Sequence, residues 1–168
     1  MIHIVGAGPG DPELITVKGA RYLAEADVVI YAGSLVNPAL LDMCKAGAEI
    51  HNSAHMTLDE VVEVIARAES EGKMTVRLHT GDPAIYGAIQ EQMDAWEKRG
   101  FDYDVVPGVS SFLGTAAALR QEYTLPGISQ TVIITRNEGR TPVPEREKLR
   151  SLAAHHATMC IFLSISMI

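Results

Sequence analysis

A chain of 168 residues with 47% hydrophobic and 21% charged residues is long enough for one medium-sized globular domain, or for one domain and part of another. Its net charge of −7, without any cluster of basic residues, argues against a nucleic-acid partner. We expect a cytoplasmic protein without a membrane partner, because the sequence has no signal-like N-terminus and no apolar run long enough to cross a bilayer.

Short apolar runs predict five strands in the first part of the chain, over residues 2–5, 28–31, 48–51, 74–79 and 103–106. Helical patterns separate these strands, over about 16–25, from 38 onward, over 58–72, from 83 to 100 and from 111 to about 120. Because helices separate the strands, we expect an α/β fold with a mostly parallel five-stranded sheet.

Several of these helices carry recognisable start signals. Thr16 is a plausible N-cap, Asn37 followed by Pro38 is a typical start, and the segment Thr57-Leu58-Asp59-Glu60 is a capping box. In the fourth helix, one face is apolar and comprises Ile85, Ile89, Met93 and Trp96.

The alternation pauses around residues 123–127, as it would at a short linker. A strand over 131–135, a helix over about 144–154 and a strand over 159–163 follow. The chain stops at Ile168, inside apolar sequence, before a second sheet can be completed. We therefore expect a first domain over residues 1–121 and an incomplete second α/β domain over residues 122–168.

The first strand runs into the glycine-rich segment Gly6-Ala7-Gly8-Pro9-Gly10-Asp11-Pro12, where backbone N–H groups of an α/β protein can face a ligand. This segment is not a dinucleotide fingerprint. Asp11 occupies the place of the last glycine, two prolines lack N–H groups, and no acidic residue ends the second strand. The loop predicts a ligand other than NAD.

Two further strands end in segments of the same kind, Thr80-Gly81-Asp82-Pro83 and Pro107-Gly108-Val109-Ser110-Ser111. In a parallel sheet, all three loops would meet at one edge. Each has an ordinary explanation too, since Asp82 before Pro83, or a serine at 110 or 111, is also typical of a helix start. The three loops together favour a ligand site.

Two polar residues, Arg77 and His79, alternate with apolar ones in the fourth strand. We interpret Arg77 as lying on the wet face of an edge strand, whereas His79 fits either such a face or the ligand site beside Gly81. No histidine or carboxylate pattern of a metal centre occurs in the sequence, so we expect no metal.

The three loops, in this order, resemble those of the tetrapyrrole methylases, which use S-adenosylmethionine and hold it between two α/β domains. Residues 31–36, 78–82, 125–136 and 158–164 are similar to one branch of that family. This branch methylates carbon C-11 of precorrin-4 or cobalt-precorrin-4 in cobalamin biosynthesis. The resemblance covers essentially the whole chain and implies a homodimer with a precorrin-type substrate.

The resemblance also implies which residues contact S-adenosylmethionine. They are Pro9, Thr80, Gly81, Asp82, Ile85, Ser110 and Ser111, with Leu163 from the second domain. The implied reaction is direct methyl transfer from a sulfonium to a ring carbon, which needs mainly good positioning of the two partners. No catalytic residue is predicted.

A polycarboxylate substrate needs local cations, and His79, Arg120 and Arg136 are the candidates. Arg120 has a second explanation, because a cation is favourable at a helix C-terminus. Three alternatives stay open at this point: a methylase that acts at another position of the tetrapyrrole, a nucleotide-binding oxidoreductase, and an inactive cofactor-binding fragment.

Overall fold

The computed structural model describes residues 1–139 and 141–167. The chain divides into two compact units, Met1–Gly114 and Thr115–Ile168. The domain limit predicted at residues 121–122 stays a prediction. Among the described residues, no helix combines the length and the apolar character needed to cross a membrane.

The first unit is built on a five-stranded sheet in which every neighbouring pair of strands is parallel, as predicted. The strands are β1 (Ile2–Gly6), β2 (Val28–Tyr31), β3 (Glu49–Asn52), β4 (Thr75–His79) and β5 (Tyr103–Val106). Their order across the sheet is β3-β2-β4-β1-β5. Strand β4 is therefore central.

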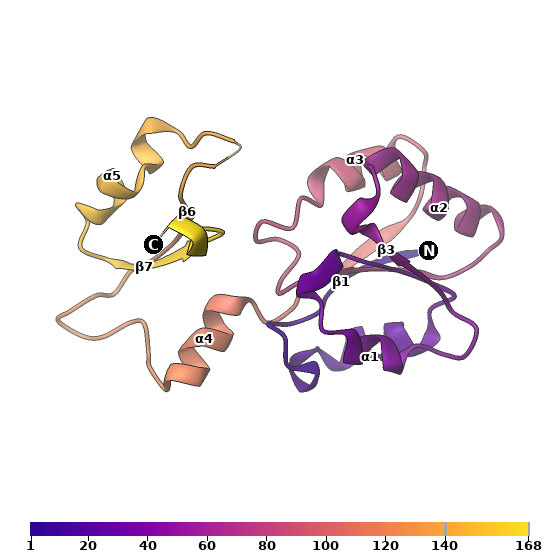
Figure 1. Cartoon of the computed structure of the whole chain (residues 1–168), viewed down its shortest axis with the longest axis horizontal. Helices are drawn as coiled ribbons and strands as arrows, with labels where there is room; N and C mark the ends of the chain where they lie inside the picture. Colours follow the sequence, from indigo (N-terminus) through magenta and orange to yellow (C-terminus); the bar gives the residue numbers. More distant parts are fainter. Residues whose placement is uncertain (140, 168) are drawn as a thin grey trace. The chain divides into compact units, whose positions relative to one another are not determined.

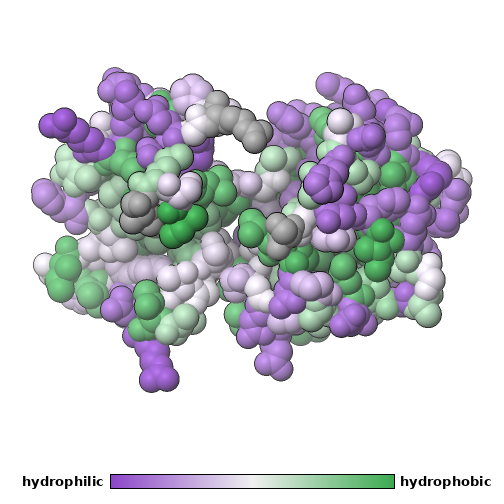
Figure 2. Space-filling model, viewed as in Figure 1, coloured by the Kyte–Doolittle hydropathy of each residue, from purple (hydrophilic) through white to green (hydrophobic). Residues whose placement is uncertain are grey.

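Helices cover both faces of this sheet (Figure 1). Helix α1 (Val17–Glu25) lies on one face, and α2 (Leu58–Ser70) and α3 (Gln90–Glu97) lie on the other. Figure 2 shows hydrophilic residues gathered over the outer surfaces of α2 and α3. This distribution is typical of amphipathic helices that cover a sheet.

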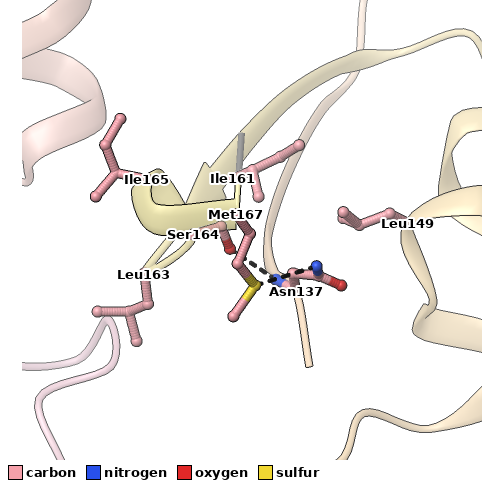
Figure 3. A pocket seen from close by; sticks show the side chains of 7 residues that line it. All are labelled: Asn137, Leu149, Ile161, Leu163, Ser164, Ile165 and Met167. Atoms are coloured by element: carbon pink, nitrogen blue, oxygen red, sulfur yellow. Dashed lines mark hydrogen bonds between the residues drawn. The ribbon is translucent and has the colours of Figure 1, made fainter. Parts of the chain in front are cut away.

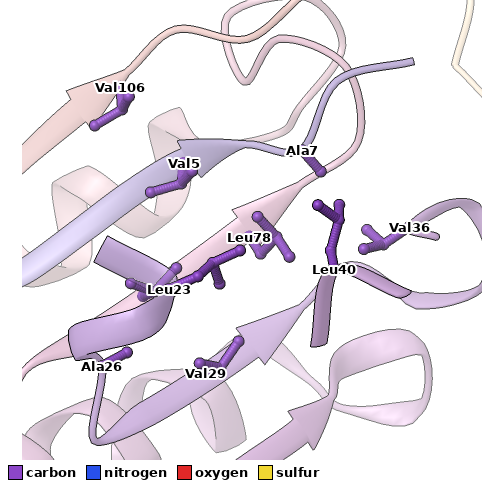
Figure 4. Close-up of a cluster of buried hydrophobic side chains, with 10 residues drawn as sticks. Val5, Ala7, Leu23, Ala26, Val29, Val36, Leu40, Leu78 and Val106 are labelled. Atoms are coloured by element: carbon purple, nitrogen blue, oxygen red, sulfur yellow. The ribbon is translucent and has the colours of Figure 1, made fainter. Parts of the chain in front are cut away.

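Each face of the sheet has its own apolar core, because successive residues of a strand point to opposite faces. Val5, Val29 and Leu78 pack on the α1 side with Leu23 and Leu40 (Figure 4). The α2 and α3 side is filled by Ile2, Ile4, Ile30, Ile65 and Trp96, all of them fully buried.

The predicted helix starts are confirmed where a side chain caps the backbone. Thr16 accepts a hydrogen bond from the N–H of Gly19 at 3.1 Å. Thr57 and Glu60 form the reciprocal capping box at the start of α2. Asn37 caps a turn of 3₁₀ helix, Pro38–Met43, rather than an α-helix. The other 3₁₀ segments are Pro12–Leu14, Gly33–Leu35, Ser53–His55, Glu145–Glu147 and Ile165–Met167.

The helix predicted from residue 83 is wrong at its start, since α3 begins at Gln90. Tyr86 and Ala88 have φ angles of 56° and 51°, which belong to the left-handed region and cannot continue a right-handed helix. Ile85 therefore lies in a turn, where its N–H donates to the carbonyl of Asp82 at 3.2 Å. Ile89, Met93 and Trp96 still belong to the core on this face.

The second unit holds two parallel strands, β6 (Val132–Arg136) and β7 (Thr158–Phe162). Helix α4 (Ser111–Leu119) precedes them in the chain, and α5 (Leu149–Ala153) lies between them in sequence. Helix α5 is shorter than the predicted helix over 144–154, because residues 145–147 form a separate 3₁₀ turn and Lys148 is extended.

Candidate functional site

The three glycine-containing loops leave neighbouring strands. Because β1 lies between β4 and β5, Val5 is paired with Leu78 on one side and with Val106 on the other. The segments that follow these strands therefore emerge side by side at the carboxyl edge of the sheet. In open α/β proteins this edge is where ligands bind.

Backbone hydrogen bonds tie the first two loops to each other. The N–H of Ala7 donates to the carbonyl of His79 at 2.7 Å. Gly8 and Gly81 exchange a pair of N–H to carbonyl bonds of 3.3 and 2.9 Å. The expectation that the N–H groups of the first loop face a ligand is therefore wrong for Ala7 and Gly8, which use them to hold the neighbouring loop.

The glycines at this edge are required by close contact between the loops. A Cβ atom on Gly6 would lie 2.5 Å from the Cα of Gly108, and one on Gly108 would lie 2.1 Å from the carbonyl oxygen of Gly81. Real Cβ atoms do not approach backbone atoms so closely. Gly10 differs, because it has open space around it and a φ angle of 124°.

Asp82 joins the second loop to the third. One carboxylate oxygen accepts the N–H of Ala84 at 2.8 Å, the local turn that the capping interpretation describes. The other oxygen accepts the N–H of Gly108 at 2.9 Å. A carboxylate has about four lone-pair sites, so each oxygen keeps the capacity to accept a further donor.

The other candidates of the first unit lie on or next to the same three loops. Pro9 is close to α4, since a Cβ on Gly114 would come within 2.9 Å of its ring. Thr80 and Ile85 are half-buried, Ser110 is buried, and Ser111 is the first residue of α4. The structure thus brings together the seven cofactor candidates of the first unit: Pro9, Thr80, Gly81, Asp82, Ile85, Ser110 and Ser111.

His79 is the last residue of β4 and is only 4% exposed. Burial lowers its pKa to about 3, and the positive charge of Arg77 contributes in the same direction. The ring is therefore neutral at pH 7, which does not support His79 as a cation for a carboxylate. Its Nε2 has no hydrogen-bond partner in the part of the chain that the structure describes, and it directly precedes Thr80 and Gly81.

The position of Arg77 contradicts the prediction from the sequence, which placed this residue on the solvent-exposed face of an edge strand. It lies at the middle of the central strand and is 6% exposed. Its Nε donates to Oε1 of Gln92 at 2.9 Å and its Nη1 to the carbonyl of Ile30 at 3.1 Å. The order of strands across a sheet is not written in the local pattern, so the sequence contained no signal for this burial.

Leu163 follows β7, has a φ angle of 54° and is 67% exposed. It lines an apolar pocket of about 270 Å³ within the second unit, together with Leu149, Ile161 and Ile165 (Figure 3). In the same pocket, the hydroxyl of Ser164 accepts the N–H of Asn137 at 3.1 Å.

The two arginine candidates have different surroundings. Arg120 is exposed and follows α4 with a φ angle of 53°, a conformation common just after a helix. The guanidinium of Arg136 donates to the hydroxyl of Thr141 at 2.7 Å and to the carbonyls of Asn137 and Pro142 at 3.2 and 3.4 Å. Arg136 therefore holds the loop that follows β6.

No group of three histidine, cysteine, aspartate or glutamate side chains that could hold a metal ion occurs within residues 1–139 and 141–167. The side chains at this edge of the sheet offer hydrogen-bonding groups, namely the Asp82 carboxylate and the Thr80 and Ser110 hydroxyls. Such a set suits a ligand with amino and hydroxyl groups.

Residues 1–168 match the family model of the tetrapyrrole (corrin/porphyrin) methylases. The cobalt-precorrin-4 C(11)-methyltransferase of Methanocaldococcus jannaschii is 62% identical over 167 residues, which are 99% of this chain and 64% of that protein. The chain thus spans slightly less than two thirds of this relative's length.

Solved structures agree with this result. An X-ray structure of a cobalt precorrin-4 methyltransferase, a cobalamin biosynthetic enzyme, is 54% identical with a TM-score of 0.96, and the match covers 99% of this chain and 70% of that one. A uroporphyrin-III C-methyltransferase from Thermus thermophilus, complexed with S-adenosylhomocysteine, is 27% identical with a TM-score of 0.77, over 98% of this chain and 66% of that one. The chain belongs to the tetrapyrrole methylase family.

Proposed function

We propose that this chain is the cofactor-binding part of an S-adenosylmethionine-dependent methyltransferase that acts on carbon C-11 of cobalt-precorrin-4. The observation that carries the proposal is the meeting of three loops at the carboxyl ends of β4, β1 and β5. Family membership and the 62% identical relative, which is named for this reaction, support it. The metal-free substrate precorrin-4 is the alternative within the same branch.

The residues at the loop edge fit S-adenosylmethionine. Asp82 can accept hydrogen bonds from the amino group or the ribose hydroxyls, since each of its oxygens has one protein donor. His79 ends β4 directly before this loop; it is buried, and its Nε2 has no hydrogen-bond partner among the described residues. Thr80, Gly81, Ile85, Pro9, Ser110 and Ser111 complete the proposed set, with Leu163 as a further contact.

When bound, the cofactor would supply an activated methyl group on a sulfonium, so the protein's share of the work is positioning. The Gly8–Gly81 hydrogen bonds and the Asp82–Gly108 bond hold the three loops in one arrangement. Preorganisation of this kind lowers the entropic cost of binding. Ile85 and Pro9 would exclude water from the reacting atoms.

For the polycarboxylate substrate, we keep Arg120 and Arg136 as proposed contacts, and His79 as a neutral one. Arg120 is exposed, whereas Arg136 already makes hydrogen bonds within its own loop. We also propose that the protein works in the cytoplasm as a homodimer, on the resemblance to its family.

Calorimetric titration of the chain with S-adenosylhomocysteine, with NAD as the control ligand, tests the cofactor assignment. We expect micromolar binding of S-adenosylhomocysteine and no binding of NAD. Binding of NAD alone would overturn the assignment. Methyl transfer to cobalt-precorrin-4 and to precorrin-4 would then be measured to decide between the two substrates.

The variant Asp82→Asn sharpens this test. Its amide can accept only one of the two N–H donors that the carboxylate now accepts, so we expect at least a roughly tenfold loss of S-adenosylhomocysteine affinity. Asp94→Asn is the matched control, because Asp94 is exposed on α3 and bonds to the side chain of Gln90. Equal affinities of the two variants would remove Asp82 from the site.

A further inference from the structure

Arg77 is a buried cation without a buried counterion. No carboxylate of the described residues lies within salt-bridge distance of its guanidinium, and both of its hydrogen-bond acceptors are neutral groups, Gln92 and the carbonyl of Ile30. Burial lowers its pKa only to about 10, so the group is charged at pH 7. An uncompensated buried charge is costly, and proteins normally pair it.

Arg77 also borders an open space. A pocket of about 170 Å³ lies between the start of α2 and the start of α3, and Arg77, Ser53, Thr57 and Gln92 contribute to its walls. A guanidinium has five N–H donors, whereas Arg77 makes two hydrogen bonds within the described residues. Donors therefore remain for a ligand in the pocket.

The neighbouring hydroxyls already have partners. Ser53 donates to the carbonyl of Tyr31 at 3.0 Å, and Thr57 donates to Glu60 at 3.0 Å. These groups shape the pocket, while Arg77 supplies the charge.

We propose that this pocket is a subsite for one carboxylate group, which pairs with the guanidinium of Arg77. Carboxylates suit arginine because the planar fork of N–H groups matches two oxygens. At about 170 Å³ the pocket is small, which suits a carboxylate with one or two attached carbons and not a whole tetrapyrrole ring.

Glu91 is the other charged residue that lines this pocket. It is exposed, and it is not among the ion pairs of the described residues. Its negative charge opposes an incoming carboxylate, so it weakens the subsite and does not replace the ligand. Arg77 is therefore expected to strengthen carboxylate binding, and Glu91 is expected to weaken it.

The test is a titration of the ¹⁵N-labelled chain with sodium acetate, followed at the Nε–Hε resonance of Arg77, with sodium chloride at equal ionic strength as control. We expect a saturable shift with acetate alone. Glu91→Gln should tighten acetate binding severalfold, because it removes the opposing charge. Arg99→Met, which removes an exposed arginine paired with Glu63 at 2.8 Å, should leave the titration unchanged.

Gln92→Glu keeps the side-chain size and places a carboxylate beside Arg77, where Oε1 of Gln92 now lies 2.9 Å from Nε. We expect this variant to bind acetate roughly tenfold or more weakly, since the protein then supplies the counterion itself. The proposal is overturned if wild-type protein shows no saturable shift, or if Gln92→Glu responds to acetate as wild type does.

Two sources of the carboxylate can be separated with uroporphyrin III, a porphyrin with eight carboxylates. A shift of the Arg77 resonance at micromolar porphyrin, reversed by excess acetate, would identify a side arm of the tetrapyrrole substrate. Response to acetate alone would identify a free small carboxylate. The first source rests on the proposed function, whereas the subsite does not: its acetate titration and the S-adenosylhomocysteine titration succeed or fail independently.

Discussion

Glycine residues at the carboxyl edge of the sheet allow the three loops to contact one another. Gly6, Gly81 and Gly108 lie at the ends of three strands, or just after them, that are distant in sequence, yet their backbones are too close for a side chain on Gly6 or Gly108. The sequence showed that glycine occurs in each loop. It did not show that the loops touch, because that follows from the order of β4, β1 and β5.

Gly108→Ala tests this steric role. The added Cβ would lie 2.1 Å from the carbonyl oxygen of Gly81, which is backbone and cannot rotate away. We expect a loss of more than about 2 kcal/mol in the free energy of unfolding, measured in urea. Gly100→Ala is the comparison, with open space but a φ angle of 70°, and should lose only about 1 kcal/mol. Equal losses would contradict the contact argument.

The burial of His79 predicts that the stability of the protein depends on pH. Its pKa is about 3 in the folded chain and near 6.5 when exposed, so below pH 6.5 the unfolded chain binds a proton that the folded chain does not. Stability is then lost as the pH falls through this range. Between pH 7 and pH 5, wild-type protein should lose about 2 kcal/mol more than His79→Gln. Urea unfolding at the two pH values measures the difference, and parallel losses would show that the histidine is not buried as neutral.

At the scale of secondary-structure elements, capping signals were the most reliable part of the sequence. The capping box of α2 involves residues three apart, so its geometry is decided locally. The N–H of Glu60 donates to the hydroxyl of Thr57 at 3.2 Å, and the N–H of Thr57 donates to the carboxylate of Glu60 at 2.7 Å.

Thr57→Ala should therefore destabilise the protein by about 1 kcal/mol, because one N–H of the first turn loses its acceptor. Thr57→Ser keeps the hydroxyl and should stay close to wild type. Thermal unfolding of the three proteins, followed by circular dichroism, gives the comparison. A serine variant as unstable as the alanine variant would point to the methyl group and not to the cap.

The start of α3, in contrast, was not predicted correctly from the sequence. Four apolar residues at helical spacing, the first of them Ile85, predicted a helix, but Tyr86 and Ala88 adopt left-handed conformations and the helix begins at Gln90. Asp82 also accepts the N–H of Gly108 from another loop, a contact that the local spacing does not reveal.

Ala88→Gly tests this strain. At a φ angle of 51°, glycine lacks the Cβ that makes the conformation unfavourable, so the variant should be more stable by up to about 1 kcal/mol. Ala116→Gly, inside α4, should be less stable by a similar amount, because glycine is a poor helix former. Urea unfolding measures both changes; destabilisation by Ala88→Gly would contradict the assigned backbone conformation.

At the scale of the whole molecule, burial is uneven between the two units. Among the described residues, every fully buried hydrophobic side chain lies between Ile2 and Val106, in the first unit. The second unit has a sheet of two strands, β6 and β7. Sheets of this size are marginally stable without additional packing.

Amide hydrogen exchange should therefore be slowest in β1 and β4, at the centre of the five-stranded sheet, and at least about tenfold faster in β6 and β7. Exchange measured by mass spectrometry on peptides from both units gives the comparison at one pH and temperature. Comparable protection of β4 and β7 would show that the second unit has a core that its burial does not reveal.

The sequence by itself determined the elements and the family. Local hydrogen bonds and side-chain periodicity depend on residues a few positions apart, so the five strands, the caps of α1 and α2 and the three ordered loop motifs could be predicted from it. Only the tertiary structure decided the order of the strands. That order buries Arg77 and His79 and brings Gly8 to Gly81 and Asp82 to Gly108. The physical reason is that these contacts join residues far apart in the chain, and their energies depend on packing between strands that no local pattern encodes.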